Sequence, residues 1–267
     1  MWSRAGSIFG VLTRRGFEEL GVRADWVIGG LFGVTVAIAL LLVVVPEIDL
    51  IVSGWFRHDE AGFIWREALF ANLAHEGIQI GARILAVVVL LGFIYCAWKR
   101  TRLLGWDRQQ WLFLLGALVV GPALVANVML KDNWGRARPV SIEQFGGSRN
   151  FSPALMFSNE CHTNCSFVAG DAAIGYYLHT IAYVVAPRRR RLVLGAGIVA
   201  GLLGGLLRIG MGAHFLSDVL FAGLFMLAAS AFTHMLVYGH NATAAWWRAL
   251  LAGNGAAPPV PPAGALP

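Results

Sequence analysis

Two stretches of this 267-residue chain, 26–45 and 111–130, contain no ionisable side chain in 20 consecutive positions. An α-helix needs about 20 apolar residues to cross the hydrocarbon core of a bilayer. Only 13% of the residues are charged, whereas soluble domains have about 25%. The sequence therefore predicts a protein embedded in a lipid bilayer.

Four further apolar runs complete the predicted set of spans. Within them ionisable side chains are rare, the main ones being Arg83, Asp171 and His179. The two shorter runs can be extended at their ends. We expect an all-α polytopic membrane protein with six transmembrane helices in a bundle; apolar stretches within 46–75 could change that count by one. The four runs are 77–98, 165–186, 192–207 and 219–236.

The two ends of the chain differ in composition from the segment between them. Residues 1–25 carry seven charged side chains and no apolar core, which indicates a cytoplasmic N-terminal segment rather than a signal peptide. Residues 239–267 are rich in Pro and Ala, and we expect a flexible tail. Residues 26–238 then form one six-span domain.

The positions of Lys and Arg predict the orientation. Segments 99–108 and 187–191 each carry four basic residues and, with the basic N-terminus, fall on one side of six alternating spans. The positive-inside rule makes that side cytoplasmic, so the net charge of +6 requires no nucleic acid. The other side, which receives 131–164 and 208–214, would face the periplasm if the membrane is a bacterial inner membrane.

A basic stretch, "KDNWGRARPV" at 131–140, falls on the outer side against this charge bias. Its cations are Lys131, Arg136 and Arg138. This position makes an ordinary basic loop beside a helix the weaker explanation. A site for an anion is the stronger one, because arginine offers planar pairs of donors to phosphate oxygens. Arg136 either contacts the anion or only flanks it.

A second polar stretch, "RIGMGAHFLSD" at 208–218, is predicted on the same side. If 214–218 is helical, His214 and Asp218 lie on one face, and the carboxylate can hold one imidazole nitrogen so that the other points outward. Backbone N–H groups at a helix start near Gly170 could bind an anion. The combination indicates phosphoryl transfer through a histidine nucleophile.

These stretches resemble the motifs of the type-2 phosphatidic acid phosphatase superfamily, which includes membrane lipid phosphatases. Its first motif is Lys, six residues, Arg-Pro, and Lys131 to Arg138-Pro139 matches it in full. Its third is Ser-Arg, five residues, His, three residues, Asp, and 208–218 carries the Arg, His and Asp. Its second, Pro-Ser-Gly-His, is matched only at Gly170. The motifs span 131–218, about a third of the chain.

The resemblance implies a phosphate-binding set. Lys131, Arg138 and Arg208 would hold the phosphate oxygens, and the backbone at Ala169 and Gly170 would add N–H donors. The family works without a metal, so the resemblance implies no cofactor. Positioning and charge neutralisation would supply most of the catalysis.

The resemblance also implies catalytic roles, and two of the three departures from the second motif bear on them. His214 would attack phosphorus and form a phosphohistidine that water hydrolyses, and Asp218 would orient His214. Asp171 stands where the family has the histidine that protonates the leaving group, and Ala169 stands where it has serine. An ionised Asp171 would instead pair with Lys131 or an arginine, which tilts the expected substrate towards a diphosphate.

We therefore expect a membrane lipid phosphatase with its site at the outer membrane surface, where a headgroup can enter while the lipid tail stays in the bilayer. The candidate substrates are undecaprenyl diphosphate, the 1-phosphate of lipid A, and phosphatidylglycerophosphate or phosphatidate. The alternatives are a phosphotransferase of the same fold and a non-catalytic lipid-phosphate binder or transporter. The sequence does not predict an oligomeric state.

The remaining candidates are cysteines and histidines outside the motifs. Cys161 and Cys165, on the predicted oxidising side, form either a disulfide or, as the sequence slightly favours, two thiols. His75, His179 and His234 are expected to be interface or helix-packing residues rather than ligands.

Overall fold

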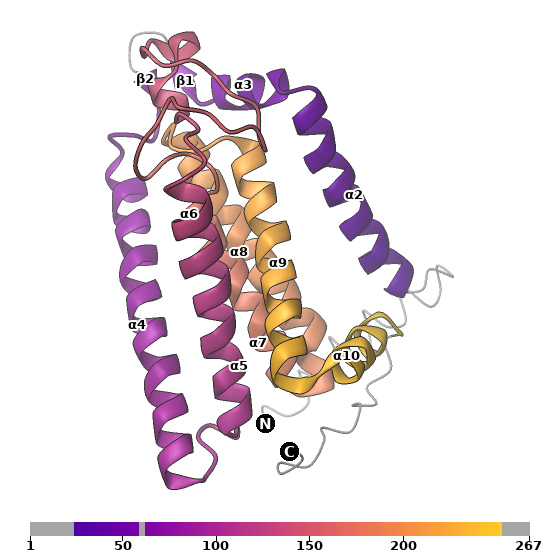
Figure 1. Ribbon diagram of the computed structural model, residues 1–267. Coiled ribbons are helices and arrows are strands. Elements are labelled where there is room, and N and C mark those ends of the chain that lie inside the picture. Colours follow the sequence, from indigo (N-terminus) through magenta and orange to yellow (C-terminus); the bar gives the residue numbers. More distant parts are fainter. Residues whose placement is uncertain (1–23, 59–61, 253–267) are drawn as a thin grey trace, which may run out of the picture.

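A computed structural model describes residues 24–58 and 62–252 (Figure 1). The expected all-α fold is confirmed, apart from one short antiparallel hairpin formed by β1 (Arg57–His58) and β2 (Gly62–Phe63). The helices are α2 (Ala24–Val44), α3 (Glu47–Gly54), α4 (Leu69–Lys99), α5 (Arg108–Leu118), the π-helix η1 (Val119–Lys131), the short 3₁₀ helices η2 (Pro139–Ser141) and η3 (Glu143–Phe145), α6 (Gly170–Tyr177), η4 (Leu178–Thr180), α7 (Ile181–Val184), η5 (Pro187–Arg189), α8 (Arg190–Gly210), α9 (Leu216–Tyr238) and α10 (His240–Ala252).

Four helical segments among the described residues are long and apolar enough to cross a membrane. A fifth is counted if the Phe32–Val44 part of α2 and α3, which meet at an angle of 101°, form one span. The prediction of several membrane-spanning helices is thus confirmed, with four or five segments of sufficient length. The four are Leu69–Lys99, Arg108–Lys131, Pro187–Gly210 and Leu216–Tyr238.

The predicted span 165–186 differs from the others. Its helical part begins only at Gly170 and passes through α6, η4 and α7 to end at Val184. The residues before it are held by other hydrogen bonds: Cys165 N–H donates to the Lys131 carbonyl and Ser166 N–H to the Arg136 carbonyl. These tertiary bonds keep the start of the segment out of the helix and fix it beside the basic stretch.

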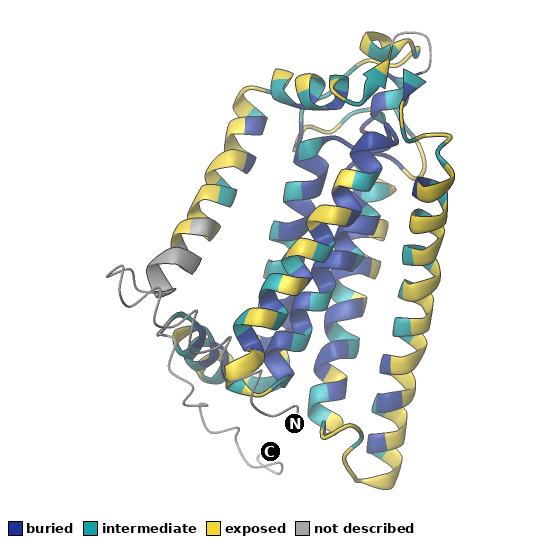
Figure 2. Cartoon of the chain, turned by 180° about the vertical axis from the view of Figure 1, so that it is seen from behind, coloured by how far each residue is buried: buried dark blue, intermediate teal, exposed yellow. Residues whose placement is uncertain are grey.

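Helix α8 packs closely against the α6–α7 segment because glycines face it. A Cβ added at Gly201 would lie 2.3 Å from the Tyr176 ring, and one at Gly197 would lie 2.4 Å from the backbone nitrogen of His179. Figure 2 shows burial concentrated in the central helices, whereas α2 and α4 expose most of their length. This close approach brings the ends of α6 and α8 together.

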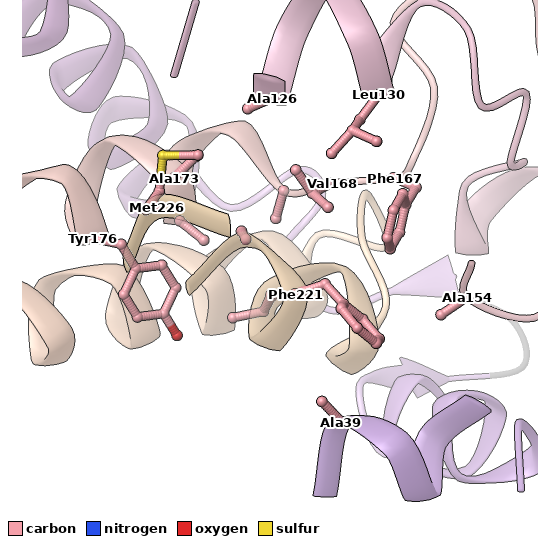
Figure 3. Packing of buried hydrophobic residues seen from close by; sticks show 14 of the residues in the cluster. Ala39, Ala126, Leu130, Ala154, Phe167, Val168, Ala173, Tyr176, Phe221 and Met226 are labelled. Atoms are coloured by element: carbon pink, nitrogen blue, oxygen red, sulfur yellow. The ribbon is translucent and has the colours of Figure 1, made fainter. Parts of the chain in front are cut away.

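A hydrophobic cluster lies beneath the loops that precede α6 and α9 (Figure 3). Phe167 and Val168 are fully buried in it, next to Phe221 and Met226 of α9 and Leu130 of η1. Burial of these two side chains holds the backbone at 167–168 in place, directly before the rest of the second-motif stretch, 169–171.

The segment 240–252 is helical, although the sequence predicted a flexible tail from 239 onwards. In α10 the side chains of Trp246 and Leu250 are only 2% and 3% exposed, and Trp246 stacks on Tyr183 with ring centroids 3.8 Å apart. Two tryptophans and two leucines give this stretch enough apolar surface to dock on the bundle. The rest of the expected tail, 253–267, and most of the expected N-terminal segment lie outside the described residues.

The segments that join α2 to α4, η1 to α6 and α8 to α9 gather at one end of the bundle, at the top of Figure 1. The basic segments 99–108 and 187–191 lie at the other end. All three motif stretches therefore meet at the end opposite to the basic segments.

Candidate active site

One cavity of about 330 Å³ opens at the loop-bearing end of the bundle. It brings together five residues that the sequence singled out, from the three motif stretches: Lys131, Arg138, Asp171, Arg208 and His214. The other lining residues are His75, Glu76, Gln79, Ile80, Arg83 and Asn164.

Three cations from the motifs line this cavity. Lys131 ends η1, and a Cβ at Gly170 would lie 2.9 Å from its ammonium nitrogen, so the glycine leaves room for the lysine. The Arg138 guanidinium donates through Nε and Nη2 to the Asn164 carbonyl, at 3.1 and 2.7 Å. Arg208 lies in the last turn of α8. Their convergence makes the cavity suited to an anion with several oxygens.

His214 lies in the turn between α8 and α9 and is almost fully buried where it lines the cavity. Its Nδ1 lies 2.6 Å from the Ser166 carbonyl oxygen, which can only accept. Nδ1 therefore carries the proton, and Nε2 keeps its lone pair. Burial lowers the pKa of His214 to about 4, so the ring is neutral near pH 7. A neutral imidazole with a free Nε2 is a nitrogen nucleophile.

Asp218 contacts His214 less directly than the sequence predicted. The two are not on one helical turn, because α9 begins at Leu216, and the distance from His214 Nδ1 to Asp218 Oδ2 is 3.6 Å. Oδ2 instead accepts from the Phe215 N–H at 2.8 Å and from the Ser166 hydroxyl at 2.5 Å. As the third residue of the helix, Asp218 caps its N-terminus, and this geometry competes with a direct bond to the ring.

Arg136 does not line the cavity. Its side chain is fully buried and donates through Nη1 to Asp218 and to the Ser217 hydroxyl, through Nη2 to Asp49, and through Nε to the Ser152 carbonyl. The two carboxylates compensate its charge in a place that water does not reach.

Asp171 forms the expected ion pair with an arginine only at long range, and its short contacts are with two residues of α4. Its Oδ2 lies 2.6 Å from His75 Nδ1 and its Oδ1 accepts from Gln79 Nε2 at 2.8 Å, whereas Arg208 Nε is 3.8 Å away. The sequence predicted that His75 is an interface or helix-packing residue; its ring also lines the cavity. Its spacing from Gln79, four residues on in an apolar helix, is the signal that could have revealed it.

His179 and His234 pack between helices, as predicted. His179 Nε2 lies 2.6 Å from the Ser230 hydroxyl, and His234 Nδ1 lies 2.7 Å from the Thr243 hydroxyl. Both rings are buried away from the cavity.

The backbone of the second motif offers fewer free N–H donors to a phosphate than predicted. Ala169 is fully buried, and its N–H donates to the Asp218 carbonyl at 3.2 Å, so it is not available to a phosphate. Gly170 is the first residue of α6, whose first-turn N–H groups lack partners within the helix.

Cys161 and Cys165 form a disulfide, so the slight preference for two thiols is wrong. Only four positions separate them, and the bridge closes a turn that contains Asn164. The Asn164 carbonyl is the acceptor for Arg138, so the turn presents an oxygen to a cavity cation.

Comparison with known proteins adds independent support. Residues 110–242 match the model of the PAP2 superfamily. The chain is 34% identical over 204 residues to a lipid A 4′-phosphatase of Francisella tularensis subsp. novicida, covering 74% of this chain and 90% of the relative. The chain belongs to the PAP2 superfamily. The match includes all three motif stretches.

Two further relatives in the PAP2 superfamily carry the same name. Lipid A 4′-phosphatases of Rhizobium leguminosarum and Rhizobium etli are each 33% identical over 183 residues, covering 68% of this chain and 75% and 68% of the relatives. No solved structure matches the chain. The protein is thus a membrane lipid phosphatase of the PAP2 superfamily, whose enzymes work without a metal.

Proposed function

We propose that the protein removes a phosphate from lipid A, at the 4′ position. Three relatives named lipid A 4′-phosphatase favour this lipid over the other substrates that the sequence allowed, and favour the 4′-phosphate over the 1-phosphate. The identity to these relatives is 33–34%, and the substrate is the first property to test.

In the proposed reaction Lys131, Arg138 and Arg208 bind the phosphoryl oxygens. His214 Nε2 attacks phosphorus, the bond to the lipid oxygen breaks, and water hydrolyses the phosphohistidine to release phosphate. The observation that carries this mechanism is the bond from His214 Nδ1 to the Ser166 carbonyl, which leaves Nε2 as the nucleophile in a cavity lined by the three motif cations. Asp218 would steady this arrangement through Ser166.

We further propose six spans in a bacterial inner membrane, with the cavity at the periplasmic face. The spans would be α2, α4, α5 with η1, the α6–α7 segment, α8 and α9. The basic segments lie at the end of the bundle opposite to the cavity, which supports a cytoplasmic location for them.

The test of the substrate is phosphate release by purified protein from lipid A, from lipid A lacking either phosphate, and from undecaprenyl diphosphate and phosphatidate. We expect release from lipid A and from the form that keeps only the 4′-phosphate. Mass spectrometry of the lipid products separates hydrolysis from transfer to a second lipid. Absence of turnover on every lipid would contradict the proposed function.

The orientation can be tested with single cysteines placed at exposed positions. Replacement of Glu143 or Arg149 should give a thiol that an impermeant reagent labels from the periplasm, and replacement of Arg188 should not. Labelling of Arg188→Cys alone would place the cavity on the cytoplasmic side.

A further inference from the structure

The cavity holds a second imidazole that no motif supplies. His75 comes from α4, outside the region 110–242 that matches the PAP2 superfamily. It is paired with Asp171, the residue that stands where the superfamily's second motif has histidine. The motif position thus carries a carboxylate instead of an imidazole, and His75 of α4 places an imidazole directly beside that carboxylate.

The contacts of Asp171 fix the orientation of His75. Its two oxygens are divided between His75 Nδ1, at 2.6 Å, and Gln79 Nε2, at 2.8 Å, and both partners come from α4, one helical turn apart. The carboxylate is 4% exposed, whereas the His75 ring is 30% exposed. A carboxylate can only accept, so Nδ1 carries the proton of this bond.

The other ring nitrogen, Nε2, has no hydrogen-bond partner within the described part of the chain. It belongs to a ring that lines the same cavity as His214 and the three cations. The two imidazoles thus have different surroundings: Nδ1 of His214 is bonded to a neutral carbonyl, and Nδ1 of His75 to a carboxylate. Paired titratable groups in unlike environments are a common arrangement for dividing nucleophilic and acid–base roles.

We propose that His75 is the proton donor to the leaving oxygen and that Asp171 is its positioning residue. This inference rests on the proposed phosphatase function. When both ring nitrogens carry protons, the bond to Asp171 is a charge-assisted pair, and the Nε2 proton is the one available to the substrate. Gln79 donates to the other oxygen of the Asp171 carboxylate, so the carboxylate cannot rotate away from His75.

The chemical step balances without any further reactant. As His214 Nε2 forms its bond to phosphorus, the bond from phosphorus to the lipid oxygen breaks, and that oxygen takes the Nε2 proton of His75 to leave as an alcohol. In the second step a water molecule gives a proton to His75 Nε2 and its oxygen attacks phosphorus. The bond from phosphorus to His214 then breaks, inorganic phosphate leaves, and both histidines return to their starting states.

This assignment changes the expected substrate class. Asp171 in place of the motif histidine suggested a leaving group that needs little protonation, such as the phosphate of a diphosphate. With His75 as donor the site can release a poor leaving group, an alcohol from a phosphomonoester. The substrate class that fits is a lipid monoester with an alkyl or sugar oxygen bonded to phosphorus.

The test compares two probes that differ in their need for a proton, dodecyl phosphate in mixed micelles and 4-nitrophenyl phosphate. The rate of leaving-group release is measured in the first turnover. We expect His75→Ala to lower this rate by ~10²-fold or more for dodecyl phosphate, the scale of general acid catalysis, and by a few-fold at most for 4-nitrophenyl phosphate. His75→Gln, which can keep the bond to Asp171, should show the same ratio if His75→Ala folds poorly.

Asp171→Asn should shift the ratio of the two rates in the same direction but less far, because it alters the position of the donor without removing it. The double variant His75→Ala/Asp171→His places an imidazole at the motif position, and we expect it to recover at least ~10-fold of the dodecyl phosphate rate lost in His75→Ala. His162→Ala, an exposed histidine in the loop before α6, is the matched control and should keep the wild-type ratio.

Equal losses on both probes in His75→Ala and His75→Gln would overturn the assignment and leave His75 as a link between α4 and α6. The proposed function fails separately, if wild-type protein shows no His214-dependent release from either probe or from any lipid phosphate.

Discussion

Arg136 and Asp218 form an ion pair from which solvent is excluded at both ends, with Nη1 and Oδ1 2.5 Å apart and neither side chain exposed. The same guanidinium donates to Asp49 Oδ2 at 2.9 Å, so α3 is tied to the first turn of α9. Asp49 also accepts from the backbone N–H of Ser217 at 2.9 Å. The turn that carries His214 is therefore held by a charge network behind the cavity.

Loss of Arg136 should destabilise the protein more than loss of an exposed arginine. Arg136→Met leaves Asp49 and Asp218 buried without a counter-charge, and breaking such a pair costs about 3–5 kcal/mol. We expect a clear fall in the thermal unfolding temperature in detergent, partly reversed in Arg136→Met/Asp49→Asn, where one of the two carboxylates is neutral. Arg149→Met, at an exposed position, is the control and should unfold like the wild type.

His214→Ala should abolish turnover while the protein still folds and binds lipid phosphate, because it removes the proposed nucleophile and leaves the three cations in place. Rapid acid-free quenching of wild-type protein with radiolabelled substrate should trap a phosphoenzyme that acid hydrolyses and base does not, as expected for a phosphohistidine. Substantial turnover by His214→Ala would rule out this mechanism.

Arg138→Lys and Arg208→Lys should each lower kcat/KM by ~10²-fold or more, the scale of losing one preorganised donor to a developing charge. Lysine keeps the charge but not the planar pair of donors, so we expect little rescue relative to alanine. Steady-state kinetics on the preferred lipid would measure this. Near-normal kinetics in Arg208→Lys would show that this arginine has a structural role.

The His214 ring should titrate far below an ordinary histidine, because burial lowers its pKa from 6.5 to about 4. Between these values the unfolded chain binds more protons than the folded one, so the stability from this group is complete above about pH 6.5 and is lost as the pH falls towards 4. NMR titration of labelled histidines, with His214→Gln for assignment, would measure the midpoint. A midpoint near 6.5 would mean that the ring is not buried as described.

Reduction of the Cys161–Cys165 bridge should weaken substrate binding more than folding. The bridge closes a very short loop, so its effect on chain entropy is small, but it holds the Asn164 carbonyl that accepts from Arg138. We expect Cys161→Ser/Cys165→Ser to raise KM by about fivefold, the equivalent of ~1 kcal/mol for one hydrogen bond. Cys96→Ser is the control, and thiol counts before and after reduction, one and three, check the bridge itself.

Much of the site could be predicted from the sequence because its motifs are local. Lys131 and Arg138 lie within eight positions, and Arg208 and His214 within seven, so their match to the spacing of the family's motifs identified them as candidates. The second motif was harder. Ala169 was expected to offer a backbone N–H, but that group bonds to the Asp218 carbonyl, and no local pattern reveals a bond between residues 49 positions apart.

The apolar runs determined by themselves that this chain forms membrane-spanning helices, because a bilayer imposes a length and an apolar composition that can be read residue by residue. Tertiary structure alone decided the partners of the buried charges. Arg136 pairs with Asp49 and Asp218 and does not line the cavity. His75 pairs with Asp171, which lies 96 residues further along the chain, and lines the cavity. A buried charge must be paired wherever the fold places it, and that pairing depends on which helices meet rather than on spacing along the chain.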